Sequence, residues 1–266
     1  MILSSVNTLS YIPRRIVSLV PSQTELLYHL GLIEETIGIT KFCIHPKEWN
    51  LNKIKVGGTK TIDIQLIREL NPDLIIANKE ENTKEQIEIL GLEFPVWLTD
   101  VNNLKEALEM ISDIGKLTHK EPIAQTLIHQ IQHEFATIPF PSAINPLLLN
   151  CCYLIWKSPY MTVGADTFIH DMIKLAGLKN CFAHKKRYPE LSIADIIEQD
   201  CKLLLLSSEP YPFKQKHIDE LQAQLPGITI ILVNGEMFSW YGSRLLSAAT
   251  YLKNLPSEIN NFTISE

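Results

Sequence analysis

Residues 15–32 read RIVSLVPSQTELLYHLGL, and this stretch decides the predicted fold. The apolar run at residues 16–19 has the length of a short strand. Three leucines then repeat at helical spacing, and Gly31 is a natural stop because glycine readily adopts the left-handed conformation that ends many helices. Ser22 and Glu25 have the spacing of a capping box at the helix start. The stretch therefore predicts a strand followed at once by a helix.

The same alternation continues as far as residue 99. Further strands are predicted at residues 37–40, 74–77 and 96–99. Asp63 is expected to cap one intervening helix. Asn82 and Glu85 have the spacing of a second capping box, and Gly91 is expected to end the helix that they begin. Strands that alternate with short helices predict a parallel sheet covered by helices.

A helical connector interrupts this pattern. Residues 104–135 show apolar residues at helical spacing only, with a second helix starting at Glu121, and residues 136–146 have the composition of a linker. Strands and helices alternate again beyond residue 147, from a strand at 147–156 to a helix at 243–254, in an order similar to the first half. The predicted domains are an N-terminal α/β lobe at 1–103, a connector at 104–140 and a C-terminal α/β lobe at 141–266.

Composition excludes several classes of protein. The formal charge is −6 and no Lys/Arg-rich tract occurs, so we expect no nucleic-acid partner. No apolar run approaches the ~18 residues that would span a membrane. Five cysteines, an odd number without a CxxC pair, favour a reduced compartment. Residues 1–15 lack the pattern of a secretory leader. These features predict a cytoplasmic protein, or a periplasmic one if a leader has been removed.

Polar and aromatic residues gather just after the predicted strands. The carboxyl ends of parallel strands meet at one sheet edge, where ligands bind in open α/β folds. Aromatic rings there offer flat walls and arginines can meet an anion, although such rings also pack the rim of a lobe. The candidate ligand-binding residues are Lys41, Phe42, His45, Gly58, Thr59, Lys60, Lys79, Glu80, Glu81, Trp156, Tyr160, Arg187, Tyr188, Glu209, Trp240, Tyr241 and Arg244.

Signatures of catalysis are weak. Residues 57–60 read GGTK, which is not a P-loop; the glycines form either an anion cradle or, more simply, a tight turn. Cys43 and His45 are spaced for a thiol–imidazole pair or for metal ligation, without a further Cys or His to support a metal. Glu80 and Glu81 suit acid–base chemistry, or stabilise the following helix. We therefore predict no enzyme, no catalytic residue and no resident metal.

Four blocks of sequence resemble one family. They are residues 15–27, residues 70–77 (LNPDLIIA), residues 175–180 (LAGLKN) and residues 187–192 (RYPELS). They are similar to blocks of the class III periplasmic binding proteins, or helical-backbone metal receptors, which serve ABC importers of cobalamin, haem and iron siderophores. The cobalamin-binding branch is the most similar, through residues 57–59 (GGT) and the YPE-LS string.

The resemblance implies a fold and a function. The fold is two parallel-sheet α/β lobes joined by one long backbone helix, with a ligand cleft between them. The function is binding of a corrinoid, haem or ferric siderophore for import. Family receptors dock their permease through one acidic residue on each lobe; Gln65 and Ala194 stand at the matching positions, beside Asp195, which weakens the prediction of a permease partner. The alternative is a leaderless cytoplasmic relative that handles a cofactor or acts as an enzyme through Cys43, His45, Glu80 and Glu81.

Overall fold

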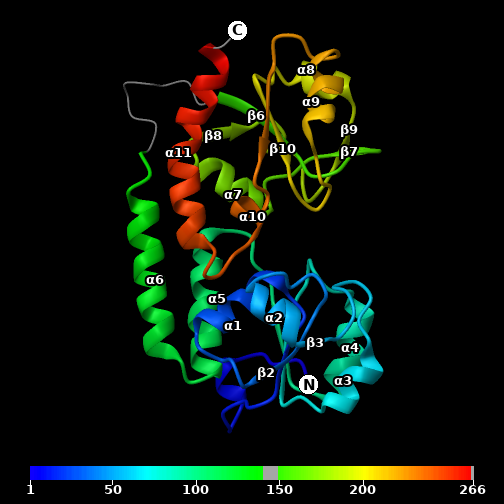
Figure 1. Cartoon of the computed structure of the whole chain (residues 1–266), viewed down its shortest axis with the longest axis vertical. Coiled ribbons are helices and arrows are strands. Elements are labelled where there is room, and N and C mark those ends of the chain that lie inside the picture. The colour runs from blue at the N-terminus through cyan, green and yellow to red at the C-terminus, as the bar shows by residue number, and fades with distance from the viewer. Residues whose placement is uncertain (140–148, 265–266) are drawn as a thin grey trace. The chain divides into compact units, whose positions relative to one another are not determined.

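The chain divides into two compact units. The computed structural model describes residues 1–139 and 149–264 (Figure 1). The first unit comprises Met1–Val101, Lys105–Gln130 and Trp240–Arg244; the second comprises Asn102–Leu104, Ile131–Ser239 and Leu245–Glu266. The segment Trp240–Arg244 thus belongs with the first unit although most of its sequence neighbours belong with the second. Among the described residues, no helix combines the length and the hydropathy that crossing a membrane requires.

A five-stranded parallel sheet forms the centre of the first unit. Its order is β3-β2-β1-β4-β5, and every neighbouring pair is parallel. The strands are β1 (Ile16–Ser18), β2 (Thr36–Ile39), β3 (Ile54–Lys55), β4 (Leu74–Asn78) and β5 (Val96–Thr99). Every residue of β1 and β4 is buried, as expected for central strands covered on both faces. The predicted parallel sheet is confirmed, and β3 is a short strand that the sequence did not reveal.

Helices cover this sheet on both faces. They are α1 (Pro21–His29), α2 (Lys47–Asn52), α3 (Ile64–Leu70), α4 (Lys84–Glu93) and α5 (Leu104–Leu117), after a 3-10 turn at Val6–Thr8; α6 (Glu121–Ala136) packs on α5. Helices α3 and α4 lie beside each other in Figure 1. Ile67 of α3 and Ile87 of α4 pack in one core cluster with Val17 and Ile75 of the central strands. This shared core cluster places α3 and α4 on the same face of the sheet.

The connector consists of two packed helices, α5 and α6. Gly115 of α5 lies so close to α6 that a Cβ built on it would stand 2.5 Å from the Ala124 Cβ. Small residues at both positions allow this close approach of the two backbones. The predicted helical restart at Glu121 is confirmed.

Three predicted helix boundaries are wrong. Helix α1 has Val20 at its N-cap without a side-chain cap, because Pro21 occupies the first helical position. The N-cap of α4 is Thr83, so the predicted Asn82–Glu85 capping box does not form. Helix α4 also continues through Gly91, where the missing side chain leaves room for Ile2.

Other boundary signals are confirmed. The Asp63 side chain accepts from the Leu66 N–H at 3.0 Å and caps α3. Gly31 follows the cap of α1 with φ +75°, as the left-handed stop requires.

The second unit has a four-stranded parallel sheet. Its order is β11-β10-β6-β8, and a separate antiparallel ribbon pairs β7 with β9. The strands are β6 (Leu149–Leu154), β7 (Tyr160–Met161), β8 (Leu178–Asn180), β9 (Glu190–Leu191), β10 (Leu203–Ser207) and β11 (Thr229–Val233). The predicted strand at 147–156 begins in residues outside the described range. The ribbon and β8 were not predicted, because runs of two or three residues carry no periodic signal.

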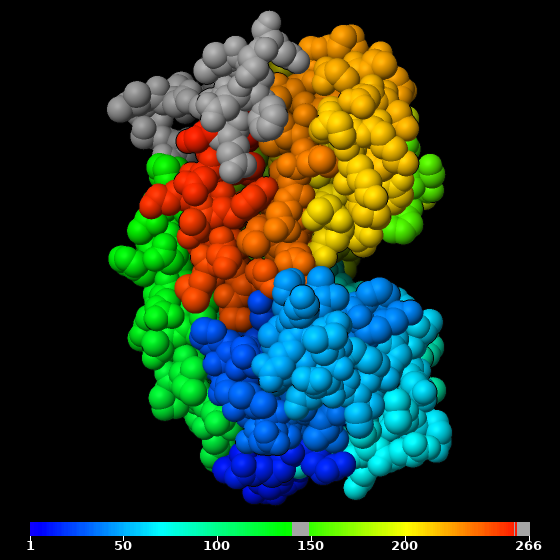
Figure 2. Space-filling model, in the orientation of Figure 1, coloured from blue at the N-terminus to red at the C-terminus, as the bar shows by residue number. Residues whose placement is uncertain are grey.

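Five helices complete the second unit. They are α7 (Phe168–Leu175), α8 (Ile193–Glu198), α9 (Gln215–Gln222), α10 (Glu236–Ser239) and α11 (Leu245–Ile264). Side chains of α11, coloured red, lie on the visible face of this unit in Figure 2. Leu252 and Leu255 are buried on the same helix, whereas Lys253 is exposed and donates to Thr137 Oγ1 at 3.3 Å. Helix α11 is therefore amphipathic and longer than the predicted 243–254.

Candidate functional site

Loops at the carboxyl ends of β1, β2 and β4 form one edge of the first unit. Backbone and side-chain hydrogen bonds link these loops. The Lys41 N–H donates to Gly57 O at 2.9 Å, which joins the loop after β2 to residues 57–60. Nine of the predicted ligand-binding residues belong to the loops after β2 and β4 and to the turn after β3, and we call this edge, together with the segment Trp240–Arg244, the first-unit face.

Asn82 organises this face. Its buried side-chain amide donates to Leu19 O at 3.2 Å and to Thr59 O at 3.1 Å, and its Oδ1 accepts from the Asn78 N–H at 2.9 Å. Asn78 Oδ1 in turn accepts from the Glu80 N–H at 2.8 Å. Sequence reasoning missed both asparagines as organising residues. The signal in the sequence was the pair Asn78 and Asn82, which stand at the two ends of the polar loop that follows the apolar residues of β4.

The Gly-rich stretch is a tight turn. Gly57 has φ +94°, and a Cβ there would stand 2.4 Å from Thr61 O. The Gly58 N–H donates to Thr61 O at 2.9 Å, so this donor is used within the turn. A Cβ on Gly58 would stand 3.2 Å from the Phe42 ring. The structure thus favours the turn over the anion cradle, and Gly58 lets Phe42 lie close to the turn.

Lysines and an exposed aromatic ring mark the same face. The Lys41 ammonium lies 5.2 Å from the centre of the Phe42 ring, which is 51% exposed. Lys60 Nζ donates to Glu80 O. Lys79 pairs with Asp100 at 2.9 Å. A partly exposed ring next to cationic groups suits a flat, bulky ligand with polar substituents.

The segment Trp240–Arg244 adds aromatic residues to the first unit. The Trp240 and His45 ring centres are 5.4 Å apart in an edge-to-face arrangement. The Arg244 guanidinium lies 5.3 Å from the Trp240 ring and binds Glu25 through two hydrogen bonds, Nε to Oε2 at 2.9 Å and Nη2 to Oε1 at 2.7 Å. This ion pair holds the segment on α1.

Tyr241 is a buried, neutral phenol. Burial raises the pKa of its hydroxyl well above the ordinary value, and the nearby carboxylates of Glu81 and Glu80 raise it further. Gln23 and Ser22 of α1 oppose this change in the pKa. The Tyr241 hydroxyl therefore lies within the electrostatic influence of α1 and of the loop after β4.

The environment of Cys43 does not favour nucleophilic chemistry. The thiol is fully buried, with Sγ 3.1 Å from Thr24 Oγ1 and 3.2 Å from Thr40 Oγ1. Burial raises the pKa of the Cys43 thiol, with smaller opposing effects from its threonine partners. A reactive cysteine needs the thiolate form, which this site disfavours. Among residues 1–139 and 149–264, no group of three or more His, Cys, Asp or Glu side chains could hold a metal ion.

Aromatic candidates in the second unit gather around Trp156. This ring is 41% exposed and lies 5.7 Å, edge to face, from Tyr211. Residue Tyr160 lies in β7, beside Trp156, which bridges to Met161. Sequence reasoning did not single out Tyr211, although it stands in the polar cluster after β10.

Arg187 and Glu209 are held by local contacts. The Arg187 N–H donates to Asp166 Oδ1 at 2.6 Å at a left-handed backbone position (φ +55°), and its guanidinium lies 5.6 Å from the Tyr188 ring. The Ser239 hydroxyl donates to Glu209 Oε1 at 2.7 Å. These contacts fix a guanidinium and a carboxylate at the loops of the second unit.

The candidates therefore divide between the units. Twelve belong to the first: Lys41, Phe42, His45, Gly58, Thr59, Lys60, Lys79, Glu80, Glu81, Trp240, Tyr241 and Arg244. Five belong to the second: Trp156, Tyr160, Arg187, Tyr188 and Glu209. Their roles in binding stay a prediction.

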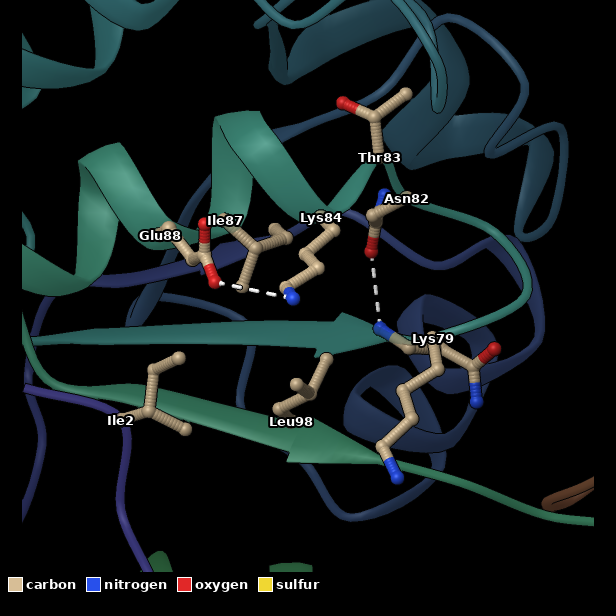
Figure 3. A pocket seen from close by; sticks show the side chains of 9 residues that line it. Ile2, Lys79, Asn82, Thr83, Lys84, Ile87, Glu88 and Leu98 are labelled. Atoms are coloured by element: carbon tan, nitrogen blue, oxygen red, sulfur yellow. Dashed lines mark hydrogen bonds and ion pairs between the residues drawn. The ribbon is translucent and has the colours of Figure 1, made fainter.

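A pocket of about 340 Å³ lies between α4 and β5, and Asn78 and Asn82 are among the residues that line it (Figure 3). Its apolar lining includes Ile2, Ile87 and Leu98, and Lys84 at its rim pairs with Glu88 at 3.7 Å. Of the predicted ligand-binding residues, Lys79 alone lines it. The other predicted ligand-binding residues therefore lie outside this pocket.

Comparison with known proteins gives one family. The family model described as "Periplasmic binding protein" matches residues 16–229. A vitamin B12-binding protein of Pectobacterium carotovorum is 24% identical over 242 residues, which cover 90% of this chain and 86% of that protein. The uncharacterized ABC transporter substrate-binding lipoprotein YvrC of Bacillus subtilis is 25% identical over 194 residues, and the match covers 70% of this chain and 61% of that relative's length.

Solved structures share the fold. The periplasmic vitamin B12-binding protein BtuF of Vibrio cholerae superposes with a TM-score of 0.75 at 20% identity, covering 93% of this chain and 98% of that one. The periplasmic haem-binding protein RhuT from Roseiflexus superposes with a TM-score of 0.79 at 20% identity, covering 92% and 98%. Two α/β units with parallel sheets are therefore the architecture of known binding proteins.

Proposed function

Because the chain belongs to the periplasmic binding protein family, we propose that it is a solute-binding protein that holds a metal-chelate ligand, namely a corrinoid, haem or ferric siderophore, for an ABC importer. Relatives named for vitamin B12 and structural neighbours named for vitamin B12 and haem support this ligand class. The role is binding rather than catalysis. We extend the proposal to a place of action outside the cytoplasmic membrane, as in the named periplasmic and lipoprotein relatives.

The observation that carries the proposal is the first-unit face. Asn82 joins the loops after β1 and β4 and the turn at Thr59 through the hydrogen bonds of its buried amide. A preformed site avoids the cost of ordering loops on binding. Phe42 offers an exposed ring, and Lys41 and Lys60 offer cationic groups beside it. We assign Phe42 to stacking on the flat ligand and the lysines to its polar substituents.

Contact with a permease is proposed to be weak. Gln65 and Ala194 are both exposed, and neither carries a charge at neutral pH. The neighbouring Asp195 uses its carboxylate to accept from the Ser192 N–H and hydroxyl, both at 2.6 Å. That carboxylate caps α8, so a basic permease residue would have to compete with the cap.

The test is a titration of the full chain with cyanocobalamin, haemin and a ferric siderophore, followed by tryptophan fluorescence. We expect saturable quenching by one of the three. Trp240→Phe should reduce the quenched signal more than Trp49→Phe, because Trp240 belongs to the first-unit face and contacts His45, whereas Trp49 lies in α2 against Tyr28. Flat titrations with all three ligands contradict the proposal.

A second variant tests the face itself. Phe42→Ala removes a half-exposed ring from the proposed stacking position, and we expect about tenfold weaker binding, equivalent to ~1.4 kcal/mol. Leu51→Ala is the matched control, since Leu51 is an exposed apolar residue of α2, outside the loops of the first-unit face. Equal affinities for Phe42→Ala and the wild-type chain would remove Phe42 from the proposed site.

A further inference from the structure

The pocket between α4 and β5 has apolar walls (Figure 3). Ile87 of α4, which is 3% exposed, faces Ile2 and Leu98 across the pocket. The backbone holds Ile2 in place, because the Leu3 N–H donates to Val96 O of β5 at 2.9 Å. The pocket volume of about 340 Å³ lies within the ~300–1,000 Å³ that is typical of small-molecule sites. The walls therefore suit a small ligand with an apolar body.

The buried polar groups at one end of the pocket are already used within the protein. The Asn82 side-chain amide donates to Leu19 O and Thr59 O, and the Asn78 side-chain amide donates to Thr99 Oγ1 at 3.1 Å. A polar group of a ligand placed among them would lose its water without gaining a partner, which is costly. The part of a ligand that enters the pocket should therefore be apolar, and any polar group should stay at the rim.

The rim of the pocket carries one available cation. The Lys84 ammonium lies 3.7 Å from Glu88 Oε1, and the two side chains are 81% and 58% exposed. This separation exceeds the roughly 2.7–3.2 Å of a hydrogen bond, so the ammonium keeps donors for another acceptor. Lys79, the other lysine that lines the pocket, is held by Asp100 at 2.9 Å. Figure 3 shows the Lys84 side chain extending from α4 toward the strands of the sheet.

We propose that this pocket binds a small monocarboxylic acid with an apolar tail, whose tail packs against Ile2, Ile87 and Leu98 and whose carboxylate pairs with Lys84. Burial of the tail drives the association, and the charge-assisted hydrogen bond orients the ligand. A singly charged head group fits better than a phosphate, because one ammonium is available and the Glu88 carboxylate beside it repels a second negative charge.

This site is independent of the metal-chelate ligand proposed above. Of the residues predicted to bind that ligand, Lys79 alone lines the pocket, and neither Phe42 nor Trp240 does. A titration with carboxylic acids therefore tests the pocket whatever the outcome of the titrations with metal chelates.

The test is a titration of the full chain with octanoate, followed by NMR of isotope-labelled isoleucine and leucine methyl groups. We expect saturable shifts of the Ile2, Ile87 and Leu98 methyl signals. Octan-1-ol has a similar tail without the charge and should bind about fivefold more weakly, the upper end of what an exposed ion pair contributes. Acetate, which lacks the tail, should not shift these signals. Absence of saturable shifts with octanoate, equal shifts with acetate, or equal affinities for octanoate and octan-1-ol would overturn the proposal.

A pair of lysine variants tests the proposed role of Lys84. Lys84→Met keeps an unbranched side chain and removes the charge, so we expect octanoate affinity to fall about fivefold while octan-1-ol affinity is unchanged. Lys105→Met is the matched control, because Lys105 pairs with Glu109 on α5 at the same distance of 3.7 Å and with similar exposure, 85% and 61%, but does not line the pocket. Equal loss of octanoate affinity in both variants, or no loss in Lys84→Met, would contradict a carboxylate bound at Lys84.

Discussion

The Arg244–Glu25 ion pair should contribute measurably to the stability of the first unit. Its two hydrogen bonds measure 2.9 and 2.7 Å, and the side chains are 13% and 21% exposed. Breaking a fully buried pair costs about 3–5 kcal/mol, and hydrogen bonds to charged groups contribute about 1.5–3 kcal/mol. Because the pair is still partly exposed, solvent screening reduces this cost, and we expect Arg244→Ala to lower the free energy of unfolding by about 2 kcal/mol.

A double-mutant cycle isolates this contribution. The cycle combines Arg244→Ala and Glu25→Ala, and unfolding in urea is followed by tryptophan fluorescence. Trp49, Trp97 and Trp240 belong to the first unit, so three of the four tryptophans report its unfolding. We expect a coupling energy of about 1–2 kcal/mol, since removing both partners leaves no charge without its counterion.

The same unit contains a matched control pair. Arg68 and Glu93 form three hydrogen bonds of 2.6–3.0 Å, but their side chains are 43% and 38% exposed. Solvent screens such a pair, so its coupling energy should be clearly smaller. Equal coupling energies in the two cycles would refute the argument that burial makes the Arg244–Glu25 pair strong.

Three further predictions concern packing, polar contacts and pH. Gly115→Ala gains helix propensity worth ~1 kcal/mol, but its new methyl group overlaps Ala124 of α6. We therefore expect urea unfolding to show a net loss of about 1 kcal/mol in the free energy of unfolding, part of which the second change Ala124→Gly should restore. A Gly115→Ala variant more stable than the wild-type chain would contradict this packing. Asn82→Ala leaves Leu19 O without its amide donor, and should cost about 2 kcal/mol and weaken ligand binding as well. Burial, and to a lesser extent Lys157, lowers the pKa of His217, so the folded state prefers the neutral imidazole. The resulting contribution to folding stability is complete above the pKa of the unfolded chain, about 6.5, and is lost as the pH falls below that value. The thermal midpoint should therefore fall on acidification less steeply in His217→Gln than in the wild-type chain, and identical slopes would exclude His217 as the cause.

Local patterns predicted the architecture well. Long apolar runs such as the one that forms β10 identify strands without help from tertiary contacts, and residues with a single dominant role, such as Asp63 at its cap, behave as the pattern predicts. The failures share one cause. The side-chain amide of Asn82 binds the turn at Thr59 instead of capping α4. Glu25, predicted in a capping box, binds Arg244, which lies 219 residues away in the sequence. A sequence pattern cannot reveal such distant partners.

The candidate site was harder to predict than the fold. The position of polar residues after strands predicted which loops lie together, because parallel strands end at one edge of a sheet. It could not show that Asn82 joins those loops, or that Trp240 is 7% exposed beside His45. Burial depends on which chain segments pack together, and residues 240–244 pack with a unit from which most of their sequence neighbours are absent.

The most direct test of the central claim is native mass spectrometry of the full chain mixed with cyanocobalamin, haemin and a ferric siderophore in equal amounts. The proposed function predicts one complex of one chain with one ligand, which Phe42→Ala weakens and Leu51→Ala does not. Retention of none of the three ligands, or equal retention of all three by both variants, would contradict a binding site for a metal chelate on this chain.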